Sequence, residues 1–212
     1  MDAEVFRAWI VSAAGVIEAN RDHLTQLDAA IGDADHGINL SRGFAAVLGA
    51  LDAAPAKPAT PGAILTLTGN TLISKVGGAS GPLYGMAFRR AGKSLGDAAD
   101  IDLPALSGAL EAALAGVQQL GAAREGDKTM VDALVPATRA FAKAIAEGAS
   151  QDDALQSLAE AAEAGAVATI SMQALKGRAS YLGPRSVGHE DPGAVSTALI
   201  LGALRDTART GP

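Results

Sequence analysis

The chain has 212 residues, a length that fits one domain with a buried core. Apolar residues make up 49% of it and charged residues 19%, which excludes a disordered chain, and the net charge of −6 argues against nucleic acid as the main partner. Cysteine is absent, which excludes disulfides and thiolate chemistry. The opening MDAEVFRAWIV does not resemble a signal peptide, and no apolar run approaches the ~20 residues of a membrane span. We therefore expect a cytoplasmic protein without a membrane contact.

Apolar residues recur at helical spacing along most of the chain. In chain order, the predicted helices cover residues 2–28, 38–51, 62–74, a segment that ends near Leu95, 104–122, 129–148, 151–175 and about 191–209. The main connections are a Pro-rich stretch at 53–62, a Gly-rich turn at 77–85 and a long polar loop at 177–193. Pro136 is expected to kink the helix that contains it.

This pattern has about eight helices, no convincing strand, no repeat and no break in composition. It predicts a single all-α domain over residues 1–212, in which amphipathic helices pack as a bundle.

The stretch AIGDADHGINLSRGF, residues 30–44, crowds Asp33 and Asp35 into one turn just after Asp28. Asp28 falls in the last turn of a predicted helix, where a carboxylate opposes the helix dipole. A turn can fold the three carboxylates around a hard cation such as Mg²⁺ or Ca²⁺. An EF-hand is excluded because Gly37 and Phe44 stand at the wrong positions. That these acids only cap and solubilise a helical turn stays open.

The second Gly-rich turn, GGASGP, offers backbone N–H groups at the entry to a helix, with Ser80 as an added donor. Such a turn alone is weak evidence for a ligand. Together with a cation site it indicates Mg²⁺ and a phosphorylated ligand.

Two further segments carry candidate ligand contacts. GAAREGDKT, residues 121–129, is a near miss for a P-loop and is rejected as one, although Gly121, Asp127 and Met130 could line a pocket. In the polar loop, Arg178 and Arg185 could offset phosphate charge or be solvated. Asp191-Pro192-Gly193 could contact a ligand through its backbone or only cap a helix.

These motifs together resemble one family. LDAAIGDADHGINLSRGF is similar to the signature of the nucleotide-binding L subunits of dihydroxyacetone kinases, and GGASGPLYG, GDKTMVDAL and GRASYLGPRSVGHEDPGA match their other motifs in order. The resemblance spans almost the whole chain. It implies eight antiparallel helices in a closed barrel, with a nucleotide in the loops at one end.

The resemblance also implies roles for individual residues. Asp28, Asp33 and Asp35 match the carboxylates that hold two Mg²⁺ ions, which hold the diphosphate. The implied nucleotide-binding residues are His36, Gly37, Ile38 and Asn39 near the phosphates, Gly78, Ala79 and Ser80 in the phosphate-binding turn, and Gly121, Met130, Arg178, Asp191, Pro192 and Gly193 around the nucleoside. Ala79 departs from the family, which often has Thr there.

In this family a separate K subunit holds dihydroxyacetone, and the L subunit supplies the phosphoryl group from its bound nucleotide. In one branch, which we favour, an M subunit recharges permanently bound ADP from phosphoenolpyruvate. In the other, free ATP exchanges. The chain has no compelling nucleophile of its own, so we expect inactivity without a K partner. An ATP-dependent ketose kinase subunit, a nucleotide-sensing module, a kinase domain with a fatty-acid-binding partner and a homodimer stay open.

Overall fold

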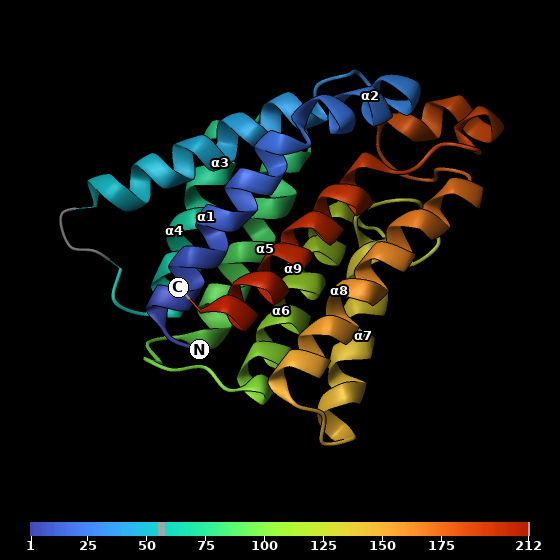
Figure 1. The fold of residues 1–212 in the computed structure, drawn as a ribbon. Coiled ribbons are helices and arrows are strands. Elements are labelled where there is room, and N and C mark those ends of the chain that lie inside the picture. Colours follow the sequence, from blue (N-terminus) through green and yellow to red (C-terminus); the bar gives the residue numbers. More distant parts are fainter. Residues whose placement is uncertain (55–57, 212) are drawn as a thin grey trace.

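The helices account for most of the chain (Figure 1). The computed structural model describes residues 1–54 and 58–211, so residues 55–57 of the predicted Pro-rich connection lie outside the described residues. The elements are α1 (Ala3–Ala19), α2 (Arg21–Ile31), α3 (His36–Ala53), α4 (Pro61–Lys75), α5 (Ser80–Leu95), α6 (Leu103–Gly121), α7 (Val131–Ala146), α8 (Gln151–Ala168), the 3₁₀ segments η1 (Thr169–Ser171) and η2 (Arg178–Ser186), and α9 (Pro192–Thr210). Within the described ranges there is no strand, only an isolated bridge between Asp2 and Asp100.

Eight of the described helices form a closed ring. α1 packs against α3, each helix from α3 to α8 packs against the next one in the chain, and α9 returns to α1. Short connections make successive helices antiparallel, and an even number of them lets α9 and α1 meet antiparallel as well. The expected closed barrel of eight antiparallel helices is confirmed. α2 lies across one end of it (Figure 1).

Alternating chain direction sorts the connections between the two ends of the ring. The connections α2–α3, α4–α5, α6–α7 and α8–α9 lie at the end that α2 covers, and both chain ends lie toward the other (Figure 1). The predicted motifs all fall in these four connections. The ring therefore gathers at one end segments that are far apart in the sequence.

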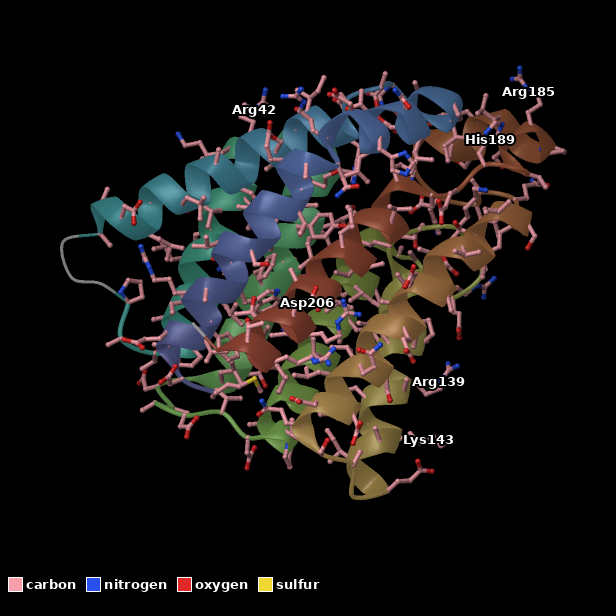
Figure 2. The ribbon with its side chains drawn as sticks, in the orientation of Figure 1. Arg42, Arg139, Lys143, Arg185, His189 and Asp206 are labelled. Carbon is pink, nitrogen blue, oxygen red and sulfur yellow. The ribbon has the colours of Figure 1, made fainter. Side chains whose placement is uncertain are left out.

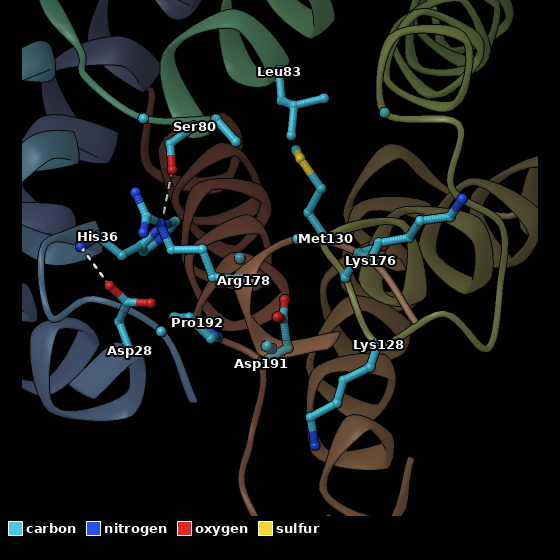
Figure 3. A pocket seen from close by; sticks show the side chains of 18 of the residues that line it. Asp28, His36, Ser80, Leu83, Lys128, Met130, Lys176, Arg178, Asp191 and Pro192 are labelled. Atoms are coloured by element: carbon cyan, nitrogen blue, oxygen red, sulfur yellow. Dashed lines mark hydrogen bonds between the residues drawn. The ribbon is translucent and has the colours of Figure 1, made fainter. Parts of the chain in front are cut away.

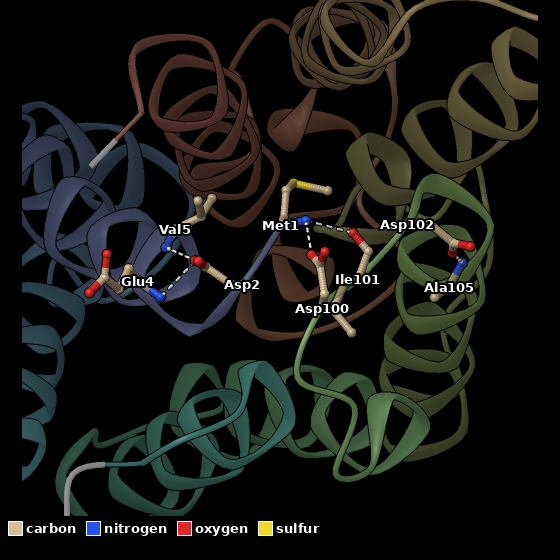
Figure 4. Close-up of polar contacts among 8 residues, drawn as sticks. All are labelled: Met1, Asp2, Glu4, Val5, Asp100, Ile101, Asp102 and Ala105. Carbon is tan, nitrogen blue, oxygen red and sulfur yellow. Dashed lines mark hydrogen bonds and ion pairs between the residues drawn. The ribbon is translucent and has the colours of Figure 1, made fainter.

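Polar contacts tie the start of the chain to the α5–α6 connection at the opposite end (Figure 4). The Met1 ammonium donates to Asp100 Oδ1 at 2.6 Å and to the Ile101 carbonyl at 2.8 Å. Asp2 accepts two backbone N–H groups and Asp102 accepts one, each from the first turn of the helix that follows, as helix N-caps do. These contacts fasten the start of α1 to the segment that precedes α6 at this end.

The core fills the inside of the ring with aliphatic residues and a small aromatic cluster. Trp9 lies 5.8 Å from Phe6 and 5.9 Å from Phe88, measured between ring centroids, and Phe44 contacts Phe88 from α3. The indole of Trp9 donates to the Ile200 carbonyl at 2.9 Å, which ties α1 to α9. None of the described helices has the length and apolarity that a bilayer span requires.

Several predicted boundaries are corrected. The single helix predicted over residues 2–28 is two helices, because the chain turns at Asn20 while the apolar spacing continues past it. Helix α5 begins at Ser80, inside the predicted Gly-rich turn, and α8 ends at Ala168 rather than near 175. The predicted polar loop contains η2. Helix α7 continues through Pro136, as the single helix predicted over residues 129–148 requires.

Helices α4 and α5 pack backbone against backbone through glycines. A Cβ added to Gly69 would lie 2.5 Å from the Gly85 carbonyl oxygen, and one added to Gly92 would lie 2.6 Å from that of Gly62. No side chain larger than hydrogen fits at these crossings. This close contact sets the position of the α4–α5 turn.

We expect Gly69→Ala to destabilise the protein by about 1–3 kcal/mol, because its new methyl group overlaps the α5 backbone. The matched control is Gly15→Ala in α1, where an added Cβ meets nothing within 4 Å and removal of glycine should stabilise the helix by about 0.5–1 kcal/mol. Urea denaturation followed by circular dichroism measures both. Equal stability of the two variants would contradict the packing described.

Candidate functional site

A cavity of about 290 Å³ opens where the four connections meet (Figure 3). Its walls come from the end of α2, the turns before α3, α5 and α7, and the segment before α9. Of the residues that the sequence proposes for metal and nucleotide, the cavity is lined by Asp28, Asp33, Asp35, His36, Gly78, Ala79, Ser80, Gly121, Met130, Arg178, Asp191, Pro192 and Gly193.

Three proposed residues do not line this cavity. A Cβ on Gly37 would lie 2.0 Å from the Arg21 carbonyl oxygen, so this glycine allows α3 to start close against α2. The Ile38 side chain is 49% exposed. Asn39 is buried and accepts a hydrogen bond from Arg42 at 2.7 Å. Their contact with a nucleotide stays a prediction.

Asp28, Asp33 and Asp35 converge at the mouth of the cavity. Each offers a carboxylate oxygen, and the three oxygens lie within 4.8 Å of one another. Asp28 is buried in the last turn of α2, and its Oδ2 accepts the backbone N–H of Asp35 at 2.8 Å and of His36 at 3.2 Å. These bonds fold the turn back over the helix end. Ala34, with φ of 61°, makes the turn between the two outer carboxylates.

This donor set fits a hard divalent cation. All its ligand atoms are carboxylate oxygens, which Mg²⁺ and Ca²⁺ prefer over the nitrogen and sulfur ligands of zinc sites. Three carboxylates this close repel one another, and a bound cation would remove that repulsion. The expectation that the turn gathers these side chains around one point agrees with the geometry.

Arg178 extends from η2 to the acidic turn. Its Nε lies 3.0 Å from Asp33 Oδ2, with the two side chains 71% and 39% exposed. A pair this exposed adds little to stability. The pair does place the Arg178 guanidinium at the mouth of the cavity beside the carboxylates, where an anionic ligand would meet the guanidinium and the carboxylate cluster together.

The side chain of His36 links three helices behind the Gly-rich turn that leads into α5. Its Nδ1 lies 3.0 Å from Ser80 Oγ of α5, and its Nε2 lies 2.8 Å from Ser196 Oγ of α9. Burial lowers the pKa of His36 to about 4, so the ring is neutral at pH 7. Tyr84 completes the network at 2.7 Å from Ser196 Oγ, and burial raises the pKa of its hydroxyl. The imidazole thus orients hydroxyls and supplies no charge.

Lys128 lines the cavity although sequence reasoning gave it no role. It is buried and donates to the carbonyl oxygens of Thr169 at 2.8 Å, Met172 at 3.1 Å and His189. Burial lowers the pKa of this ammonium. Its partners lie 41, 44 and 61 positions away in the chain, so no local pattern reports them.

Other cavity residues were also absent from the sequence-based set. They include Ile31, Gly32, Leu83, Tyr84, Val117, Ala123, Thr129, Val131, Lys176, Gly177 and Ala179. Asp127, suggested for the pocket, does not line this cavity and accepts the backbone N–H of Arg124 instead. Arg185 and His189 are exposed, with Arg185 at the outer end of η2 (Figure 2).

The DAK2 domain family matches residues 30–206. The chain belongs to the DAK2 family. Among the relatives of this DAK2 chain, the ADP-binding subunit DhaL of the PEP-dependent dihydroxyacetone kinase of Escherichia coli is 42% identical over 201 residues, which are 95% of each chain. The triokinase/FMN cyclase of Rattus norvegicus is 40% identical over 189 residues, which are 89% of this chain and 32% of that one.

A solved structure has the same fold. The dihydroxyacetone kinase from C. freundii, crystallised in complex with AMP-PNP and Mg²⁺, superposes with a TM-score of 0.71 and is 28% identical. The match covers 98% of this chain and 34% of that chain, so this DAK2 chain spans about a third of that kinase. The resemblance inferred from the motifs is confirmed.

Asp191 is a buried carboxylate between the cavity and α9. It caps α9, since its Oδ2 accepts the Ala194 N–H at 2.7 Å. Burial raises the pKa of Asp191 from 3.8 to about 7, the charges of Asp132 and Asp28 add to this rise, and the bond from Ala194 and the charge of Lys128 oppose it. Near neutral pH its folded form therefore retains a proton that the unfolded chain has lost.

This raised pKa predicts a pH dependence of stability. Because the folded pKa lies above the unfolded one, the contribution of Asp191 is complete below about pH 4 and is lost as pH rises through about 7. Asp191→Asn keeps a cap acceptor and cannot titrate. The free energy of unfolding of Asp191→Asn minus that of the wild type should rise by on the order of a few kcal/mol between pH 4 and 7.5. Urea denaturation of both proteins across this range measures the difference, and a constant difference would count against the assignment.

Proposed function

We propose that this DAK2 chain is the nucleotide-binding L subunit of a dihydroxyacetone kinase. In this proposal it transfers a phosphoryl group from Mg²⁺-bound nucleotide to dihydroxyacetone held on a separate K subunit, in the cytoplasm. A phosphocarrier M subunit recharges the bound ADP from phosphoenolpyruvate. The observation that carries the proposal is the carboxylate cluster beside the α4–α5 turn, in a chain whose relatives of similar length are named ADP-binding subunits.

The polarity of the cavity supports a nucleotide. Asp28, Asp33 and Asp35 would hold two Mg²⁺ ions, which when bound neutralise phosphate charge and fix phosphate geometry. Next to them the first turn of α5 begins at Ser80, and backbone N–H groups at a helix start bind phosphate well. Both groups face the same cavity.

The rest of the wall suits a nucleoside. Leu83, Val117 and Met130 give it an apolar surface, on which a base can lie. Gly121 and Gly193 leave room for close approach of a flat ring. Apolar walls with a few polar groups are typical of ligand sites in proteins.

Phosphoryl transfer of this kind depends on positioning and charge neutralisation. His36 is neutral and bonded through both ring nitrogens, which does not suit a covalent phosphate carrier. The chain's own residues would bind and orient the nucleotide, and the acceptor would come from the K subunit. The subunit alone should therefore be inactive.

A second candidate is the ATP-dependent form of the same chemistry, acting on dihydroxyacetone or a related ketose. It is favoured by the 40% identity to a triokinase/FMN cyclase, close to the 42% identity to the bacterial subunit. A nucleotide-sensing module without phosphoryl transfer is a further alternative, and phosphoryl turnover with any K subunit would exclude it.

Reconstitution tests the proposal. Purified protein, dialysed exhaustively in Mg²⁺ buffer, should retain ADP and should phosphorylate dihydroxyacetone when K, M and a phosphocarrier system fed by phosphoenolpyruvate are added. Turnover with K and free ATP, together with loss of ADP on dialysis, would support the ATP-dependent form. No transfer under either condition would reject kinase function.

We expect Asp33→Ala to weaken Mg²⁺-dependent ADP binding at least tenfold, because it removes one carboxylate of a small ligand set. Helical content should be nearly unchanged, since Asp33 is exposed and outside the helices. Asp22→Ala is the matched control, because it removes the same charge from an exposed position on α2 outside the cavity. Calorimetry with ADP and Mg²⁺ compares them. Unchanged ADP affinity of Asp33→Ala would reject the cation site and leave the turn as an acidic connection between two helices.

A further inference from the structure

The segment before α9 leaves the barrel and returns to it at a narrow neck. We define the neck as residues 169–172 and 188–191, and the lip as residues 173–187 between them. The lip contributes Lys176, Gly177, Arg178 and Ala179 to the cavity wall. The lip meets the rest of the protein at three places: the Leu175 N–H donates to the Asp127 carbonyl at 3.0 Å, Arg178 Nε lies 3.0 Å from Asp33 Oδ2, and η2 packs against α2.

Lys128 joins the two sides of the neck. Its ammonium donates to Thr169 and Met172 on one side and to His189 on the other. Two further bonds close the neck beside it: the Gly188 N–H donates to the Ile170 carbonyl at 2.7 Å, and the Asp191 N–H donates to Thr169 Oγ1 at 2.9 Å.

The backbone that carries Lys128 is itself held rigidly. Lys128 has φ of 59°, in the left-handed region that side-chain-bearing residues rarely adopt. Asp132 braces the turn on both sides, since its two oxygens accept the N–H of Gly126 at 2.5 Å and of Thr129 at 2.7 Å. The backbone of Lys128 is therefore held in place, and its ammonium binds the two sides of the neck from there.

We propose that Lys128 is a positioning residue for the nucleotide, whose ammonium closes the neck and thereby sets the place of Arg178 and Asp191 in the cavity wall. An ammonium has three N–H donors, and here three carbonyl oxygens take them. None is left to donate to a phosphate. Lys128 acts on the ligand through the lip, unlike the phosphate-binding lysine of a P-loop.

The first test is Lys128→Met, which keeps the length of the side chain and removes its donors. We expect the Kd for ADP with Mg²⁺ to rise about tenfold to a hundredfold. Amide hydrogen exchange of the lip should accelerate while that of α1 and α6 stays unchanged. In the reconstituted kinase KM for the nucleotide should rise and kcat at saturation should stay close to that of the wild type, because Arg178 and Asp191 would contact the nucleotide equally before and during transfer, and loss of such uniform binding raises KM alone.

Chemical rescue supplies the matched control. Because the chain has no cysteine, K128C carries a single thiol, which can be alkylated in the unfolded state before refolding. Reaction with 2-bromoethylamine restores an ammonium at nearly the lysine length, and 1-bromopropane gives a neutral chain of the same length. The aminoethyl protein should regain ADP affinity and slow exchange of the lip, and the propyl protein should not.

Three results would overturn the proposal. The first is equal ADP affinity of the two alkylated proteins. The second is a fall of kcat of Lys128→Met with KM unchanged, which would assign Lys128 to the transferred group. The third is low helical content of both Lys128→Met and the propyl protein, which would assign Lys128 to folding of the whole chain. The catalytic readout rests on the proposed function. ADP binding and hydrogen exchange need no partner, so absence of phosphoryl transfer in the wild type would reject that function and leave this test standing.

Discussion

Closure of an even ring of antiparallel helices is the constraint on which the site depends. It places every second connection at one end, so the acidic turn, the Gly-rich turn, the Lys128 turn and the segment before α9 meet although they are spread over residues 28–193. Glycine contacts between α4 and α5 and the return of α9 to α1 keep the ring closed. The site geometry follows from packing of the barrel more than from any single loop.

The three carboxylates at the mouth of the cavity repel one another, and the structure offsets part of this cost. The carboxylate of Asp28 is buried in the last turn of α2, where the helix dipole disfavours a negative charge. In place of water it accepts two backbone N–H groups from the turn that follows. Asp33 and Asp35 remain partly exposed beside it. Burial favours the neutral forms of His36, which directly follows Asp35, and of Asp191 in the segment before α9. The three clustered carboxylates therefore lie together on the side of the cavity where a cation and phosphates would bind.

Local sequence patterns predicted the parts of the fold and site that depend on neighbours in the chain. The acidic turn, the Gly-rich turn and the Asp191-Pro192 cap are each predicted from a few neighbouring residues, and residues of all three line the cavity. The turn at Asn20 was missed because apolar spacing continues across it. Lys128 was missed because its three acceptors come from distant backbone, and a carbonyl oxygen carries no residue-specific signal.

The His36 network has a consequence for how the protein can fail. One neutral ring joins the start of α3 to α5 and α9, which are helices from the first, middle and last parts of the chain. Loss of any one of these helices removes a hydrogen-bond partner from the other two. Partial unfolding should then abolish the ligand site as a unit, so a half-folded chain could not retain nucleotide. In a cell, a bound ligand would therefore report that α3, α5 and α9 are all in place.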